Sequence, residues 1–197
     1  MEIIPAILTA DKRKLEEWLG LISESGKFER VQIDFVDGEY ANNKSVNVEE
    51  MESIGILKYR LMYDAHLMVI EKNVGKYLTM TKNVGFDRII VQFESVSSLQ
   101  DFTGLALDMH SPVEAIEPYL RNLEVVVVMG VEPGFGGQKF NEEVIKKIKR
   151  LSSLKEVNSF EYRICVDGGV DQEQLPELEA AGADEVAVGV GRVLKWV

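Results

Sequence analysis

Cysteine is almost absent from the 197-residue chain, which contains only Cys165. One thiol cannot form an intrachain disulfide, so a disulfide-stabilised secreted domain is excluded and a reducing compartment is favoured. Basic residues are also scarce, because 22 Lys and Arg stand against 33 Asp and Glu, which gives a formal net charge of −11. Without a stripe of Lys and Arg, neither nucleic acid nor an anionic membrane is an expected partner.

Long apolar runs are missing as well. The run at residues 125–129, four valines and a methionine, is far shorter than the ~20 apolar residues that a membrane helix needs. Residues 1–5 lack the positively charged segment and the small-residue cleavage site of a secretory signal. We therefore expect no transmembrane segment and a cytoplasmic location. The length and the 46% apolar content predict a single domain over residues 1–197.

The chain alternates between β-rich segments and segments with helical periodicity. The β-rich segments predict eight strands, at residues 3–8, 30–35, 60–66, 87–93, 102–107, 124–129, 161–166 and 184–189. Apolar residues at helical spacing predict amphipathic helices between them, with one stripe at Leu15, Trp18, Leu19 and Ile22 and another at Val144, Ile145, Ile148 and Leu151. Asn141 and Asp171 stand where helix N-caps are expected.

This alternation is typical of α/β proteins, and eight strand–helix units without a linker predict a closed (β/α)8 TIM barrel. The valines at 125–128 are apolar on both faces of their strand, as expected for a parallel strand between a barrel interior and a helix layer. An open doubly wound sheet is the alternative. The turn at residues 8–11, Leu-Thr-Ala-Asp, lacks the glycine-rich dinucleotide motif of that fold.

Two of the expected helices lack room. Only residues 95–101 separate Glu94 from the strand that begins near Phe102, whereas a crossover with its helix needs about 10–12 residues. The eighth strand is followed by residues 190–197 alone. The fourth and the C-terminal helix should therefore be shortened or absent, which leaves the barrel wall beside strands 4, 5 and 8 uncovered. Because exposed apolar area usually finds a partner, we expect a homo-oligomer.

Polar residues cluster at the predicted carboxyl ends of the strands, where barrels of this type carry their reactive groups. Gln32 and Asp34 share one face of the second strand, His66 lies on the third and Asp167 on the seventh. Two carboxylates and an imidazole suit Zn²⁺, Fe²⁺ or Mn²⁺. A structural histidine or a turn-forming aspartate, as at Asp37, would explain single residues. Their joint placement on three strand ends favours a functional site.

Glycines form three clusters that a barrel would bring close together. They are Gly134, Gly136 and Gly137 around Phe135 after the sixth strand, Gly168 and Gly169 after the seventh, and Gly189 at the end of the eighth. Glycine permits positive φ and close backbone approach, so successive N–H groups can form a concave anion site. A tight turn explains one Gly-Gly pair but not three clusters. We therefore expect a phosphate site that uses backbone donors and does not depend on net charge.

Six segments resemble the ribulose-phosphate 3-epimerase family and follow the family's order. They are residues 5–11 (PAILTAD), 34–38 (DFVDG), 64–68 (DAHLM), 129–140 (MGVEPGFGGQKF), 166–170 (VDGGV) and 181–184 (AGAD). The resemblance implies a barrel enzyme that interconverts ribulose 5-phosphate and xylulose 5-phosphate. It also implies a phosphorylated sugar as substrate and a divalent metal, Zn, Fe, Mn or Co, as cofactor.

The resemblance further implies roles for individual residues. Asp34 and Asp167 match the acid–base carboxylates, and Asp34, His66 and Asp167 match metal ligands, with Gln32 at a fourth ligand position. The implied phosphate contacts are Gly134, Phe135, Gly136, Gly137, Gly168, Gly169, Gly189 and Val190, and the implied pocket residues are Ala6, Met68 and Met129.

The chain departs from the family next to these groups. Gln32 stands where the family has a histidine, and its neutral amide oxygen is a weaker ligand for Zn²⁺ than imidazole nitrogen. Other family residues are replaced by Ala6, Val36, Gln92, Gly130 and Val190. Three hypotheses stay open: a working epimerase, a non-catalytic phosphosugar-binding protein, and a phosphosugar decarboxylase or aldolase on the same barrel. Val36 disfavours the third, whose relatives carry a lysine there.

Overall fold

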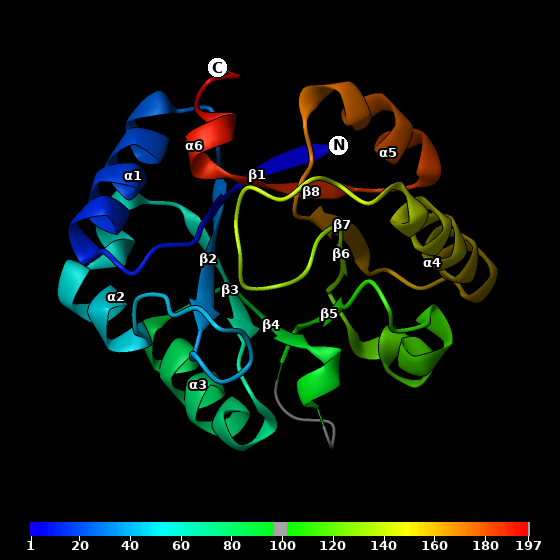
Figure 1. The fold of residues 1–197 in the computed structure, drawn as a ribbon, viewed down its shortest axis with the longest axis horizontal. Coiled ribbons are helices and arrows are strands. Elements are labelled where there is room, and N and C mark those ends of the chain that lie inside the picture. Colours follow the sequence, from blue (N-terminus) through cyan, green and yellow to red (C-terminus); the bar gives the residue numbers. More distant parts are fainter. Residues whose placement is uncertain (97–101, 197) are drawn as a thin grey trace.

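A computed structural model describes residues 1–96 and 102–196 and shows a closed barrel of parallel strands (Figure 1). The strands are β1 Glu2–Ile7, β2 Arg30–Val36, β3 Met62–Met68, β4 Arg88–Gln92, β5 Gly104–Leu107, β6 Val125–Met129, β7 Arg163–Asp167 and β8 Glu185–Gly189. Each strand pairs with the next, and β8 pairs with β1 to close the barrel. The predicted fold class is confirmed. The third strand lies two residues later than predicted, so that it runs through His66 to Met68.

Helices surround the strands on the outside of the barrel (Figure 1). They are α1 Lys12–Ser25, α2 Val48–Ile54, α3 Glu71–Val84, α4 Ile145–Asn158, α5 Leu175–Ala181 and α6 Val190–Val193, with 3₁₀ turns at Ile56–Tyr59, Phe93–Ser95, Val113–Asn122, Glu142–Val144 and Gln172–Gln174. The predicted caps are confirmed, because the side chain of Asn141 accepts from the N–H of Glu143 and that of Asp171 from the N–H of Gln172. The caps satisfy N–H groups that have no partner inside their helices.

The fourth and the C-terminal helix of the barrel are both shortened in the described part of the chain, as predicted. After β4 comes a single 3₁₀ turn, and after β8 comes the four-residue α6. Residues 97–101, the rest of the predicted short connection, lie outside the described residues. Partly buried apolar side chains, Phe93, Val96 and Phe102, flank this connection.

The homo-oligomer stays a prediction, and light scattering tests it. Apolar side chains that are only partly covered, such as Phe93 and Phe102, should be buried by a second copy of the chain, since association removes apolar surface from water. The expected particle mass is therefore at least twice the 22.2 kDa of one chain. A monodisperse particle of 22.2 kDa would contradict the prediction.

The apolar core lies mainly between the strands and the helices. Outward-facing strand residues such as Ile33, Phe35 and Leu67 pack with Leu15 and Leu19 of α1 into one cluster. The barrel interior holds a smaller apolar layer, made of Ala6, Ile90, Ala106, Val125, Val127, Met129, Cys165 and Ala187. Burial raises the pKa of the Cys165 thiol, which fits a packing role rather than a reactive thiolate.

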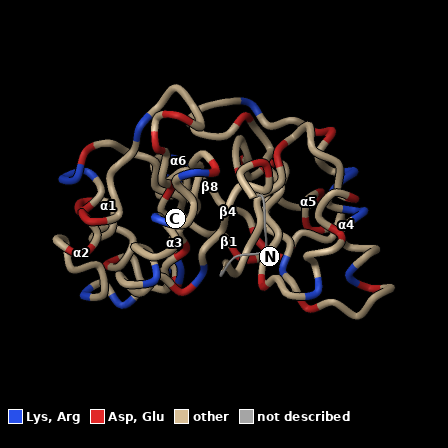
Figure 2. The backbone as a smooth tube through the Cα atoms, turned by 90° about the horizontal axis from the view of Figure 1, so that it is seen from below, with Lys and Arg blue, Asp and Glu red and all other residues tan. Residues whose placement is uncertain are grey.

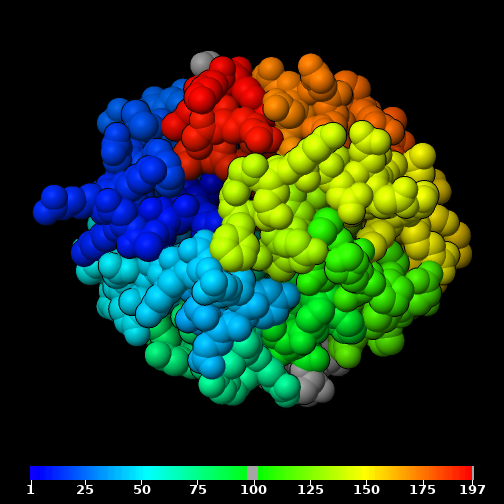
Figure 3. Space-filling view, viewed as in Figure 1, coloured from blue at the N-terminus to red at the C-terminus, as the bar shows by residue number. Residues whose placement is uncertain are grey.

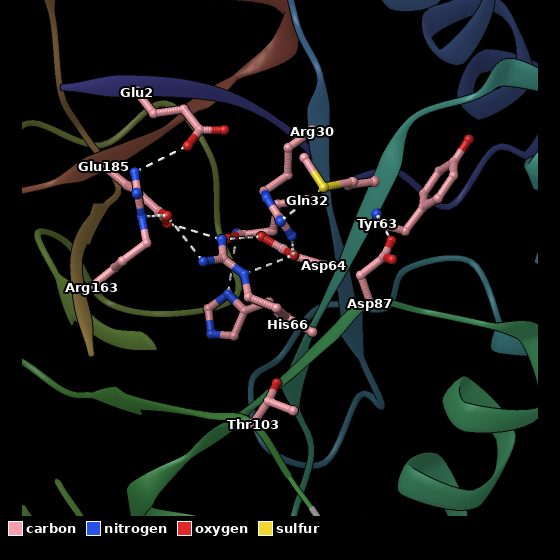
Figure 4. A network of polar contacts seen from close by, with 12 residues as sticks. Glu2, Arg30, Gln32, Tyr63, Asp64, His66, Asp87, Thr103, Arg163 and Glu185 are labelled. Carbon is pink, nitrogen blue, oxygen red and sulfur yellow. Dashed lines mark hydrogen bonds and ion pairs between the residues drawn. The ribbon is translucent and has the colours of Figure 1, made fainter. Parts of the chain in front are cut away.

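An ion network fills the barrel at the amino ends of the strands (Figure 4). The buried guanidinium of Arg88 on β4 donates to Asp64 on β3 (Nε to Oδ1, 3.0 Å) and to Glu185 on β8 (Nη1 to Oε1, 3.0 Å). Arg30 also contacts Asp64, and Arg163 also contacts Glu185. Each buried carboxylate thus meets two guanidinium groups, which offsets the cost of removing its charge from water. This network fills the barrel at the amino ends of the strands, so a site inside the barrel can form only at their carboxyl ends.

The charged residues of the described chain show no continuous basic stripe in the view of Figure 2, where Lys and Arg are interspersed with Asp and Glu. Within residues 1–96 and 102–196, no helix is both long and apolar enough to cross a membrane.

Candidate active site

A cleft of about 610 Å³ opens at the carboxyl ends of the strands. In Figure 3 its mouth is the hollow between the blue N-terminal part and the yellow-green loop that follows β6. The residues proposed from the sequence as catalytic, phosphate-binding or pocket residues all line it, namely Ala6, Asp34, His66, Met68, Met129, Gly134, Phe135, Gly136, Gly137, Asp167, Gly168, Gly169, Gly189 and Val190. Gln32 lies beneath the cleft floor and is fully buried.

Three candidate ligands converge at the bottom of this cleft. Asp34 on β2 and His66 on β3 are register partners, and β7 on the other side of the barrel brings Asp167 toward them. His66 Nδ1 lies 3.4 Å from Asp34 Oδ1 and 3.3 Å from Asp167 Oδ2. One donor atom from each of the three residues lies within 4.8 Å of the others. The alternation of side chains along the strands thus places two carboxylates and an imidazole in one buried cluster.

The side chain of Gln32 joins the two carboxylates. Its Nε2 donates to Asp34 Oδ1 at 2.8 Å and to Asp167 Oδ2 at 2.7 Å, and it lies 3.4 Å from His66 Nδ1. Gln32 and Asp34 are two residues apart on β2, so both side chains point into the barrel. Figure 4 shows Gln32 and His66 beside the side chains of the ion network.

Burial and nearby charges shift the pKa values of Asp34 and His66. Burial raises the pKa of Asp34, and the nearby carboxylate of Asp167 adds to that increase, while hydrogen bonds from His66 and Gln32 oppose it. Burial alone would lower the pKa of His66, but its contacts with Asp167 and Asp34 outweigh burial and raise the pKa to about 9. A carboxyl group with a raised pKa is suited to exchange a proton near neutral pH.

The donor set fits a divalent metal. Two ligands that each lie about 2.1 Å from a tetrahedral ion are about 3.4 Å apart, which matches the separations between His66 Nδ1 and the two carboxylates. The side chain of Gln92 lies behind His66, and its Nε2 is 3.0 Å from His66 Nε2. Its Oε1 is buried and has no hydrogen-bond partner among the described residues. Turning this amide lets Oε1 accept the proton of His66 Nε2. His66 Nδ1 then offers its lone pair to an ion.

The glycine loops approach one another closely at the rim. Gly168 and Gly169 have φ of +99° and +74°, and Gly134 has φ of +90°. A Cβ on Gly168 would lie 2.3 Å from Cγ2 of Val131, and one on Gly169 would lie 2.5 Å from the backbone N of Phe140. Only glycine allows this backbone path, which brings the loops after β6 and β7 together over the cleft.

Arg192 is a cleft residue that sequence reasoning missed. Its Nη1 donates to the carbonyl oxygens of Gly169 at 3.1 Å and Val170 at 2.6 Å, which fixes the loop after β7 to α6. The side chain also lines the cleft, so it brings a positive charge to the glycine rim of an acidic protein. The signal in the sequence was its position three residues after Gly189, beside the third glycine cluster.

Asp37 lies outside the buried cluster. Its carboxylate accepts from the N–H of Tyr40 at 2.8 Å and from the side-chain amide of Asn73 at 2.8 Å. Burial opposes ionisation, but these hydrogen bonds outweigh it and lower the pKa of Asp37. The residue therefore anchors the loop after β2, which corresponds to the turn interpretation of this aspartate.

Comparison with known proteins places this chain in a family. The model of the family described as "Ribulose-phosphate 3 epimerase family" matches residues 2–192. The ribulose-phosphate 3-epimerase of Bacillus subtilis is 31% identical over 96% of this chain and 90% of its own length, and that of Methanocaldococcus jannaschii is 32% identical over 93% and 80%. A mutant tryptophan synthase alpha-subunit from Pyrococcus furiosus aligns with a TM-score of 0.70 over 96% of this chain and 87% of its own, at 15% identity, which shows the shared fold alone. The chain belongs to the ribulose-phosphate 3-epimerase family.

Proposed function

We propose that this protein is an epimerase that interconverts ribulose 5-phosphate and xylulose 5-phosphate. The observation that carries the proposal is the pair of buried carboxylates, Asp34 and Asp167, which reach the cleft from opposite sides of the barrel. The relatives named ribulose-phosphate 3-epimerase, which align with more than nine-tenths of this chain, support the same reaction.

Asp34 and Asp167 supply the two proton transfers. Inversion at the carbon beside the carbonyl, C3, requires that one group removes the proton from one face and another returns a proton to the opposite face. In one direction Asp34 is the base and Asp167 the acid, and in the reverse direction the roles exchange. The raised pKa of Asp34 brings its carboxyl group closer to the range in which it can both accept and return a proton.

Backbone groups of the glycine rim hold the phosphate. Gly136, Gly168 and Gly189 line the cleft, so a phosphate bound by their N–H groups would direct the sugar toward the carboxylates. Met68 and Met129 line the cleft near its floor with apolar surface that displaces water from the reacting carbon. This arrangement separates binding at the rim from chemistry at the floor.

Asp34, His66 and Asp167 are the residues that would hold a divalent metal, and Zn, Fe, Mn or Co suits these donors. When bound, the ion polarises the substrate carbonyl and stabilises the negative charge that develops on its oxygen. His66 contributes no proton transfer in this scheme. Its position is held from behind by Gln92.

Incubation with ribulose 5-phosphate, followed by ¹³C NMR, tests the proposal. We expect xylulose 5-phosphate to form in the presence of added Zn²⁺ or Mn²⁺ until both sugars are at equilibrium, with the same mixture reached from either side. Binding of ribulose 5-phosphate without any conversion would contradict the proposal. That result would favour the second candidate, a non-catalytic phosphosugar-binding protein, for which the amide bridge of Gln32 between the carboxylates is the supporting observation.

Replacing Arg192 by methionine should raise KM for ribulose 5-phosphate about tenfold while kcat changes by less than about twofold. The loop that carries Gly169 and Val170 loses two hydrogen bonds and a nearby positive charge, whereas the carboxylates are untouched. Steady-state kinetics measure both constants. Lys195→Met is the matched control, since Lys195 lines the same cleft but, within the described residues, its side chain makes no hydrogen bond to this loop. Equal KM values for the two variants would contradict a positioning role for Arg192.

A further inference from the structure

We propose that Gln32 takes over the bridging role of the metal ion in the metal-free protein, where its side-chain amide holds the two carboxylates together. When an ion binds, the amide turns and becomes a ligand of that ion. In the metal-free protein the amide presents its N–H groups to Asp34 and Asp167. In the metal-bound protein the same amide presents Oε1. The inference concerns folding and metal binding, so it holds whether or not the protein catalyses epimerisation.

The position of the amide supports this exchange. Gln32 Nε2 lies 2.8 Å from Asp34 Oδ1, 2.7 Å from Asp167 Oδ2 and 3.4 Å from His66 Nδ1. It therefore occupies a fourth corner of the cluster, at hydrogen-bond distance from the two carboxylates and 3.4 Å from His66 Nδ1. A half-turn of the terminal amide exchanges Nε2 for Oε1 at this corner without moving the backbone of β2.

The chemistry of the amide explains how the cluster is stable without metal. A primary amide has two N–H hydrogens, and the cluster contains two buried carboxylates that each accept one of them. Without these donors, two carboxylates close together in a buried site would repel each other and would have to share His66 Nδ1 as a partner. Hydrogen bonds to ionised acceptors are among the stronger ones in proteins. The neutral amide of Gln32 thus bridges the two carboxylates by hydrogen bonds, as a cation would bridge them by its charge.

The same contacts oppose metal binding. An amide nitrogen has no free lone pair for an ion, so the ion binds only after the amide has turned and both hydrogen bonds to the carboxylates have been broken. The affinity for metal is therefore lower than that of a site whose four ligands already present lone pairs. Gln32→Glu keeps the size of the side chain, removes the N–H donors and adds an anionic ligand. It should bind Zn²⁺ at least about tenfold more tightly than the wild type.

Thermal unfolding in EDTA and calorimetric titration with Zn²⁺ test the proposal. We expect the wild type to keep its Tm in EDTA, and Gln32→Glu to lose about 5 °C or more there and to regain it with Zn²⁺. Gln138→Glu is the matched control, because Gln138 lines the same cleft but donates to the backbone oxygens of Glu132 and Phe135. The control should bind Zn²⁺ as the wild type does. Equal Zn²⁺ affinity of Gln32→Glu and the wild type, or a wild type that unfolds when EDTA is added, would overturn the proposal.

The wild type provides a second measurement that needs no variant. ¹⁵N–¹H NMR should show the two Nε2 protons of Gln32 as separate signals, protected from solvent exchange, in EDTA. Saturation with Zn²⁺ should shift both signals and change their exchange rates, because the amide has turned away from the carboxylates. Signals that stay unchanged on saturation with Zn²⁺ would show that the amide does not turn, which would overturn the exchange of Nε2 for Oε1.

Discussion

Replacing Asp34 or Asp167 by asparagine should lower kcat for ribulose 5-phosphate by about 10²- to 10⁴-fold in each case. Asparagine has nearly the shape of aspartate but cannot accept a proton from carbon. Each variant therefore blocks one of the two transfers that inversion needs. Substrate affinity should change little, because the phosphate contacts we propose lie at the glycine rim, around residues such as Gly168.

Steady-state kinetics and calorimetric binding of ribulose 5-phosphate separate the two effects. Asp171→Asn is the matched control, since Asp171 also lines the cleft but caps the helix that follows, and asparagine caps helices as well as aspartate does. The control should keep kcat within about twofold of the wild type. An Asp34 or Asp167 variant that turns over at the wild-type rate would remove that residue from the acid–base pair.

Replacing Arg88 by methionine should lower the free energy of unfolding by about 3–5 kcal/mol. Arg88 contacts both Asp64 and Glu185 inside the barrel, so its removal leaves two buried carboxylates with one guanidinium partner each. Burial lowers the pKa of Arg88, but its hydrogen bonds with these carboxylates outweigh burial and raise the pKa overall, so the group stays charged in the barrel. The substitution removes the attraction between Arg88 and the two carboxylates, and this attraction is strong because the barrel interior is poorly solvated.

Urea-induced unfolding measures this loss, and Arg150→Met is its matched control. Arg150 pairs with Glu114 and Glu117 on the surface, where ion pairs contribute at most about 1 kcal/mol. We therefore expect a much smaller change for this variant than for Arg88→Met. Equal stabilities of the two variants would show that the barrel interior repacks around methionine without a penalty.

The barrel and the placement of the two carboxylates could be predicted because they depend on periodic patterns. Strands buried on both faces, such as residues 125–128, identify a parallel sheet, and the two-residue period places Asp34 on the same face of its strand as Gln32. The glycine pair after the seventh strand also indicates close backbone approach, and Gly168 and Gly169 indeed have positive φ.

The ion network and the bridging amide could not be predicted, for two physical reasons. Asp64, Arg88 and Glu185 lie near the starts of three separate strands, and only the closure of the barrel brings their side chains into contact. The hydrogen bonds of Gln32 depend on the rotation of one side chain, which no pattern in the sequence records. Such features follow from tertiary packing rather than from local preference.

Deuterium incorporation at C3 of ribulose 5-phosphate tests the two-carboxylate mechanism most directly. ¹H NMR in D₂O follows the C3 proton with wild-type protein and added Zn²⁺ or Mn²⁺, and with Asp34→Asn and Asp167→Asn under the same conditions. We expect the wild type to replace this proton by deuterium while xylulose 5-phosphate forms, and both variants to be slower by orders of magnitude. A wild-type protein that binds the sugar phosphate but leaves the C3 proton in place at every metal concentration would contradict the mechanism.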